Sequence, residues 1–201
     1  MAKLYFKYGA MNCGKTTVLL QTAYNYEEKG LKVKIFKPAV DTKAGDKISS
    51  RLGAERKVDY LIKEGDHIYD IIDKNDLPDI YLIDEAQFLT PEQVLEFYKI
   101  TKEFDVGVIA YGLRNTFLID QPFLGSPKLL LLADEIEELK TMCRCGRKAT
   151  QHARFLNGKP LFEGDAILID GTSDVVYESV CGKCYFELAG QIKKEDKNDW
   201  N

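Results

Sequence analysis

The stretch KLYFKYGAMNCGKTT, residues 3–17, places an apolar run directly before a glycine-containing loop and the start of a helical pattern. Within it, Gly9, Gly14, Lys15 and Thr16 match the motif GxxxxGK(S/T). Glycines allow consecutive backbone N–H groups to turn inward around phosphate oxygens, at the positive end of the following helix. Because the motif leaves a predicted strand and enters a predicted helix, it predicts a triphosphate-binding loop.

The loop residues have separate expected roles. The lysine would neutralise the outer phosphates, and the threonine hydroxyl would ligate Mg²⁺. Cys13 is expected only to fill space. The residues expected to surround the nucleotide are Gly9, Ala10, Met11, Asn12, Cys13, Gly14, Lys15 and Thr16.

A second nucleotide element is YLIDEAQF, residues 81–88. P-loop proteins use an acidic residue at the end of an apolar strand to hold magnesium through water, and Asp84 suits that role. Glu85 follows at once, where it could take a proton from an attacking hydroxyl. An ATPase uses such a glutamate to polarise water, whereas a kinase uses it to deprotonate an acceptor hydroxyl, so this pair alone leaves both activities open.

Short apolar runs alternate with helical patterns over the first two-thirds of the chain. Strands are expected at residues 3–9, 32–38, 79–86 and 106–112, with helices at residues 15–29 and from Pro91 after an N-cap at Thr90. Residues 41–75 indicate only loops and a short helix near residues 69–74. The alternation predicts an α/β fold, a parallel sheet with flanking helices that binds ligands at the carboxyl ends of its strands.

The pattern changes near Thr141, where short β-like runs (AILID and VVYESV) and turns at Asn157-Gly158 and Gly171 follow. Four of the five cysteines lie here in two close pairs: Cys143, Cys145, Cys181 and Cys184. Four thiolates predict a closed, structural zinc site. We expect a P-loop domain over residues 1–140, a zinc-binding β-rich domain over residues 141–192, and a charged flexible tail over residues 193–201.

Composition limits the partners. The 201 residues include 28 Lys and Arg against 32 Asp and Glu, a net charge of −4, which disfavours a nucleic-acid partner. The densest apolar stretch, residues 129–133, is far too short for a bilayer span, and no targeting segment is visible. The expectation is a cytoplasmic protein with no membrane partner.

At DEAQF the chain resembles the thymidine kinases of the cellular, zinc-containing type (type II), found in bacteria, animals and some large viruses. GAMNCGKTT resembles that family's phosphate loop, with Ala10 where proline is common. KPAVDTK is similar to its Asp-x-Arg segment, with Lys43 in place of the arginine, and AYGLRNTF to the segment after its fourth strand. CRCGRKAT and VVYESVCGKCYFE are similar to its zinc-bearing lasso, so the resemblance extends over nearly all of residues 3–188.

The resemblance implies a thymidine kinase that transfers the γ-phosphate of ATP to the 5′-hydroxyl of thymidine, giving dTMP for DNA precursor synthesis. Glu85 would be the base, Thr16 and Asp84 would position magnesium, and Ala86 and Gln87 would lie beside the nucleotide. Feedback inhibition by dTTP and a homotetramer are also implied. The residues implied to contact thymidine are Met11, Phe88, Leu113, Phe117, His152, Ile169, Gly171 and Tyr177.

Two other functions stay open. One is a P-loop ATPase acting on nucleic acid, which would need a second lobe or an arginine in trans, a basic stripe and stacking aromatics. The chain's length and negative charge disfavour it. The other is a non-catalytic nucleotide-sensing module, in which Glu85 would be incidental.

Overall fold

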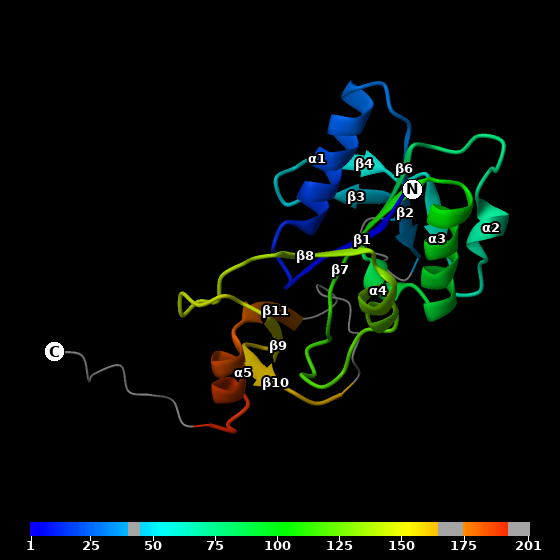
Figure 1. Ribbon diagram of the computed structural model, residues 1–201. Coiled ribbons are helices and arrows are strands. Elements are labelled where there is room, and N and C mark those ends of the chain that lie inside the picture. The colour runs from blue at the N-terminus through cyan, green and yellow to red at the C-terminus, as the bar shows by residue number, and fades with distance from the viewer. Residues whose placement is uncertain (40–44, 165–174, 193–201) are drawn as a thin grey trace.

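A computed structural model of the chain describes residues 1–39, 45–164 and 175–192, and its centre is a six-stranded sheet. All neighbouring strands of this sheet pair in parallel, in the order β5-β2-β6-β7-β1-β8 (Figure 1). The strands are β1 (Leu4–Gly9), β2 (Val33–Pro38), β5 (Tyr60–Ile62), β6 (Ile80–Ile83), β7 (Gly107–Gly112) and β8 (Glu135–Leu139). The predicted α/β class with a parallel sheet is confirmed.

Helices cover both faces of the sheet. The helix α1 (Lys15–Glu28) lies on one face, where Leu19 packs in a cluster with Ile35 and Leu82. The helices α3 (Pro91–Glu103) and α4 (Ser126–Leu132) lie on the other face, together with the short α2 (Ile68–Ile71). Since strand side chains alternate between faces, the four central strands β2, β6, β7 and β1 supply buried or partly buried side chains to both faces, as in a parallel sheet covered by helices.

The expected start of α3 is confirmed in detail. Thr90 is its N-cap, and its side-chain oxygen accepts a hydrogen bond from the Gln93 backbone N–H at 3.2 Å. The Gln93 side chain accepts from the Thr90 N–H at 3.1 Å, which completes a capping box, and Pro91 occupies the first helical position.

The prediction that residues 41–75 hold only loops and a short helix is wrong. A hairpin of β3 (Lys47–Ser49) and β4 (Glu55–Lys57) lies there, and β5 extends the main sheet beside β2. These strands have three residues each, too few for an alternation of polar and apolar residues to show. The expected helix is present as α2, a little earlier than predicted.

The sequence patterns also do not predict the edge strand β8 or the helix α4. The sequence of β8 is EIEEL, and its first three residues are exposed. Such an acidic run does not indicate a strand. It is held by parallel pairing with β1 and by ion pairs from Lys3 to Glu135 and from Lys7 to Glu137.

A separate three-stranded antiparallel sheet forms the cysteine-rich part, in the order β10-β9-β11. Its strands are β9 (Gln151–Leu156), β10 (Lys159–Leu161) and β11 (Val175–Val180), followed by the helix α5 (Gly182–Leu188), which the sequence did not indicate. Asn157 (φ 51°) and Gly158 (φ 74°) form the predicted two-residue turn between β9 and β10, where both positions need positive φ. The AILID run and the turn at Gly171 lie outside the described residues.

The two sheets meet at the phosphate loop. Ala10 of this loop packs in one cluster with Ala149, Ala153 and Val180 of the cysteine-rich part. The domain limits at residues 140 and 192 stay a prediction, and the tail from residue 193 lies outside the described residues. Within the described residues, no helix has the length and apolar character needed to cross a bilayer.

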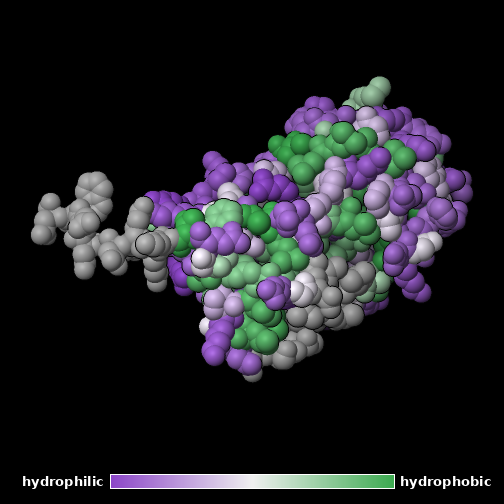
Figure 2. Space-filling model, turned by 90° about the horizontal axis from the view of Figure 1, so that it is seen from below, coloured by the Kyte–Doolittle hydropathy of each residue, from purple (hydrophilic) through white to green (hydrophobic). Residues whose placement is uncertain are grey.

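Figure 2 shows one face of the molecule, on which hydrophobic patches alternate with hydrophilic ones. Leu131 is 73% exposed and Leu124 is 58% exposed. The homotetramer stays a prediction.

Candidate active site

The phosphate loop begins where β1 ends. A Cβ atom built on Gly9 would lie 2.5 Å from the Leu139 carbonyl oxygen of β8, so only glycine fits there. At the other end Gly14 is the N-cap of α1 with φ 86°, a conformation that glycine adopts without strain. The helix therefore begins at Lys15 with its N–H groups directed toward the loop, which is the arrangement that binds phosphate.

Lys15 is buried against the loop. Its Nζ donates a hydrogen bond to the Ala10 carbonyl oxygen at 3.3 Å, and the Cys13 backbone N–H donates to the same oxygen at 3.3 Å. The ammonium group is thus held next to the space that the backbone of the loop encloses, where it can meet the outer phosphates of a nucleotide.

Thr16 and Asp84 bring two oxygen ligands together. Asp84 follows β6, and its Oδ2 accepts a hydrogen bond from the Thr16 hydroxyl at 3.2 Å. Burial raises the pKa of Asp84 to about 7, and the neighbouring Glu85 carboxylate acts in the same direction. A hydroxyl beside a buried carboxylate is the oxygen donor set that Mg²⁺ takes, and the cation would offset the cost of burying this charge.

Glu85 has a left-handed backbone conformation, with φ 50° and ψ 40°. A non-glycine residue in this region costs about 1–3 kcal/mol, which is typical of functional positions. The Asp84 Oδ1 accepts from the Glu85 backbone N–H at 3.1 Å and supports the turn. The side chain of Glu85 is half-buried at the carboxyl edge of the sheet.

Gln87 fixes the direction of the Glu85 carboxylate. Its Nε2 donates to the Glu85 Oε2, and its Oε1 accepts from the Leu113 backbone N–H at 3.0 Å. A Cβ atom on Gly112 would lie 2.9 Å from the Gln87 Oε1, so this glycine makes room for the amide. Gln87 therefore connects the end of β7 to the proposed base.

The residues expected to wall the thymine site are partly brought together. Phe117 is buried, and its ring lies 6.3 Å from that of Tyr177, edge to face. The Arg154 guanidinium lies 3.8 Å from the centroid of Phe117. The Tyr185 hydroxyl donates to the Phe117 carbonyl oxygen at 3.0 Å.

The other expected contacts are more scattered. Phe88 packs against Phe123 at 5.5 Å between ring centroids, whereas Leu113 is buried after β7 and Met11 is half-buried in the loop. Lys43, Ile169 and Gly171 lie outside the described residues. The binding roles of all these side chains stay predictions.

His152 and Ser179 make contacts that the sequence did not reveal. The His152 Nε2 accepts a hydrogen bond from the Met11 backbone N–H at 3.1 Å, and the Ser179 hydroxyl donates to the Met11 carbonyl oxygen. Burial lowers the pKa of His152 to about 4, so the ring stays neutral and keeps an acceptor nitrogen. The partners lie 141 and 168 residues from Met11, a separation at which no local pattern gives a signal.

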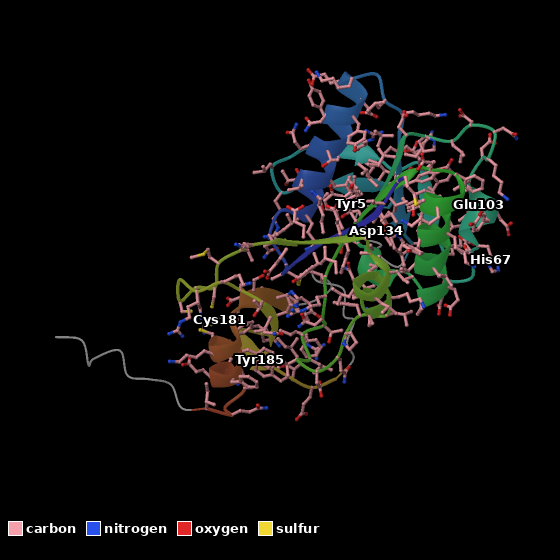
Figure 3. The ribbon with its side chains drawn as sticks, viewed as in Figure 1. Tyr5, His67, Glu103, Asp134, Cys181 and Tyr185 are labelled. Carbon is pink, nitrogen blue, oxygen red and sulfur yellow. The ribbon has the colours of Figure 1, made fainter. Side chains whose placement is uncertain are left out.

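The four expected metal ligands meet at one point. The sulfur atoms of Cys143, Cys145, Cys181 and Cys184 all lie within 4.8 Å of one another. Tetrahedral Zn–S bonds of about 2.3 Å place sulfurs roughly 3.8 Å apart. The Cys145 and Cys181 sulfurs, 3.6 Å apart, fit this geometry. Figure 3 shows Cys181 beside Tyr185 at α5.

Thiol ionisation in this cluster is uneven. The Arg147 backbone N–H lowers the pKa of Cys145 to about 6, whereas burial raises the pKa of Cys184. The ionisation equilibria of thiols this close together are coupled, and a divalent cation favours the thiolate form of all four. Since four sulfurs leave no open position, such an ion would be structural.

A glycine loop with Lys-Thr after β1 and an Asp-Glu pair after β6, at one edge of a parallel sheet, define a P-loop nucleotide-binding protein. The sequence model of the thymidine kinase family matches residues 2–185. The chain therefore belongs to the thymidine kinase family.

Relatives of this chain align with it over almost their whole length. A thymidine kinase of Enterococcus faecalis is 44% identical over 191 residues, covering 92% of this chain and 95% of the relative. One of Streptococcus pyogenes is 45% identical over 188 residues, covering 92% and 98%. One of Francisella tularensis is 42% identical over 195 residues, covering 93% and 98%.

Proposed function

We propose that this protein transfers the γ-phosphate of ATP to the 5′-hydroxyl of thymidine, giving dTMP and ADP. The observation that supports it most strongly is the Glu85 carboxylate, which Gln87 holds in the residue that follows Asp84, the hydrogen-bond partner of Thr16. Family membership supports thymidine as the acceptor.

Each side chain then has a role in the transfer. The Glu85 carboxylate accepts the proton of the 5′-hydroxyl as that oxygen bonds to the γ-phosphorus and the bond from the γ-phosphorus to the β–γ bridging oxygen breaks. Lys15 and the N–H groups of the loop stabilise the charge on the phosphoryl oxygens. Mg²⁺, held by Thr16 and Asp84 with the ATP, would supply further positive charge there.

A coupled ADP-release assay tests this function. Thymidine and deoxyuridine should stimulate ADP release, whereas deoxycytidine should not. Backbone groups expected to pair with the thymine edge would face the reversed donor pattern of cytosine, at about 1–3 kcal/mol for each unpaired buried group. ADP release that responds to single-stranded DNA and not to thymidine would contradict the proposal and favour the nucleic-acid ATPase. The nucleotide-sensing alternative predicts no release in either case.

We also infer four further properties of this protein. Thymidine triphosphate should inhibit the thymidine kinase activity, with its base in the thymidine site and its phosphates reaching the phosphate loop. Inhibition that is competitive with neither ATP nor thymidine would contradict this. The cysteine cluster should hold one zinc ion. The protein should be a homotetramer, which light scattering of the purified protein would test. It should also be located in the cytoplasm.

A further inference from the structure

Met11 is held on both sides by neighbouring strands of the second sheet. His152 in β9 and Ser179 in β11 are direct partners in the antiparallel register. Side chains at such paired positions emerge on one face within a few ångströms of each other. Their polar atoms therefore reach the two backbone groups of one residue, the N–H and the C=O of Met11.

Each of these hydrogen bonds fixes a whole peptide group. A peptide group is planar and trans, so its C=O and N–H point in opposite directions and turn together. The Met11 N–H belongs to the same peptide group as the Ala10 carbonyl, which accepts from the Lys15 ammonium at 3.3 Å and from the Cys13 N–H at 3.3 Å. The bond to His152 thus sets the carbonyl that positions Lys15.

The bond from Ser179 acts on the next peptide group. The Met11 carbonyl shares its plane with the Asn12 N–H, so holding the oxygen also sets the direction of that N–H. Asn12 then takes a left-handed conformation, with φ 64°, where the loop reverses. Two consecutive peptide groups of the phosphate loop are therefore oriented by side chains from the second sheet.

His152 is suited to this role by its surroundings. The ring is buried, with only 3% of its surface exposed, and hydrogen bonding with the backbone of Thr116 and Asn115 acts on the same ring. Since the Nε2 accepts from Met11, the proton of the neutral ring is on the Nδ1. A charged imidazolium has no acceptor and could not make this contact.

We propose that His152 and Ser179 are positioning residues for the nucleotide site, which set the geometry of the phosphate loop from the second sheet. Neither side chain needs to touch ATP. The inference rests on the proposed function only for the nature of the ligand, a nucleoside di- or triphosphate in the loop.

The test is the affinity of the purified full-length protein for MgADP, measured by titration calorimetry. His152→Leu removes the acceptor, Ser179→Ala removes the donor, and His152→Gln keeps an acceptor oxygen near the position of the Nε2. Val175→Ala is the matched control, because Val175 is buried in the same strand as Ser179, lies outside the cluster that contains Ala10, and has no hydrogen-bonding group in its side chain.

His152→Leu and Ser179→Ala should each weaken MgADP binding roughly three- to tenfold, the range of one hydrogen bond. The double variant should weaken MgADP binding by a factor smaller than the product of the two single-variant factors, because both side chains act on Met11. His152→Gln and Val175→Ala should remain within about twofold of the wild type. Unchanged affinity in both single variants would overturn the proposal, and so would an equal loss in Val175→Ala. If His152→Leu fails to fold, the comparison of Ser179→Ala with Val175→Ala decides.

This test can fail or succeed independently of the proposed kinase function. If the wild type binds MgADP with the expected pattern of losses but does not phosphorylate thymidine, only the kinase assignment fails. If the wild type is an active thymidine kinase and the variants bind MgADP normally, only the positioning role fails.

Discussion

Glu85 combines an unfavourable backbone conformation with a carboxylate held by Gln87, and this defines the site at the scale of single residues. The left-handed turn moves the chain away from β6, so that Asp84 faces Thr16 while Glu85 stands at the edge of the sheet. Gln87 then holds the Glu85 carboxylate. The site depends on orientation as much as on residue type.

Replacing Glu85 with Gln should separate binding from chemistry. The amide keeps the size of the side chain but cannot accept the hydroxyl proton, so kcat should fall by roughly 10²–10⁴-fold. MgATP affinity should be retained, because Lys15, Thr16 and Asp84 are unchanged. Steady-state kinetics together with a binding titration measure both quantities, and near-normal turnover would remove Glu85 from the mechanism.

Replacing Gln87 with Leu should reduce both stability and rate. The buried Leu113 N–H would lose its acceptor, which costs about 1–3 kcal/mol of the free energy of unfolding. The Glu85 carboxylate would lose its donor, so kcat should also fall. Urea denaturation and kinetics on one preparation test this, and Gln87→Glu is the comparison, because it keeps an acceptor for Leu113. A Gln87→Leu variant as stable and active as the wild type would contradict the role of this amide.

The sequence predicts residues of the site where their roles depend on local spacing. Lys15, Thr16, Asp84 and Glu85 belong to short motifs whose chemistry requires adjacent residues. The role of His152 could not be predicted in this way, because it depends on the pairing of β9 with β11 and on their distance from Met11.

At the scale of secondary-structure elements, the long and buried elements can be predicted from the sequence, whereas the short or exposed ones cannot. The strands β1, β2 and β7 are six-residue segments rich in apolar and aromatic residues, and α3 has both a capping box and an apolar face, so each can be predicted from the sequence. The strand β8 is an exposed acidic edge strand that only its pairing with β1 defines. Tertiary pairing here overrides a weak β-propensity.

The N-cap of α3 offers a test at this scale. Thr90→Ala removes the side-chain acceptor for the Gln93 N–H and should reduce the free energy of unfolding by about 1 kcal/mol. The active-site residues lie on other elements, so the KM values for ATP and thymidine should not change. Thr90→Ser keeps the oxygen and is the control. Equal stability of the Ala and Ser variants would show that the cap contributes nothing.

At the scale of the whole molecule, the cysteine cluster joins segments far apart in the chain. Cys143 and Cys145 precede β9, whereas Cys181 and Cys184 lie at the start of α5, which also carries Tyr185. The Tyr185 hydroxyl bonds to the Phe117 carbonyl, so the cluster is connected to the proposed thymine site. The second sheet also contacts the phosphate loop, through the hydrogen bond between His152 and Met11.

Removing one ligand should loosen this connection. Cys181→Ser should release the metal and raise the KM for thymidine more than the KM for ATP, because α5 holds Phe117 directly. Elemental analysis of the wild type and the variant, beside their kinetics, measures this. A structural zinc site would be contradicted if wild-type protein purified without any chelator were fully active with far less than one equivalent of zinc.

The central claim is that the phosphoryl group passes from ATP to the thymidine hydroxyl, and the most direct measurement follows that group. Wild-type protein is incubated with γ-labelled ATP, Mg²⁺ and thymidine, and the products are separated. The account predicts the label in dTMP, formed only when thymidine is present. Label released as inorganic phosphate at one rate with or without thymidine, and none in dTMP, would contradict it.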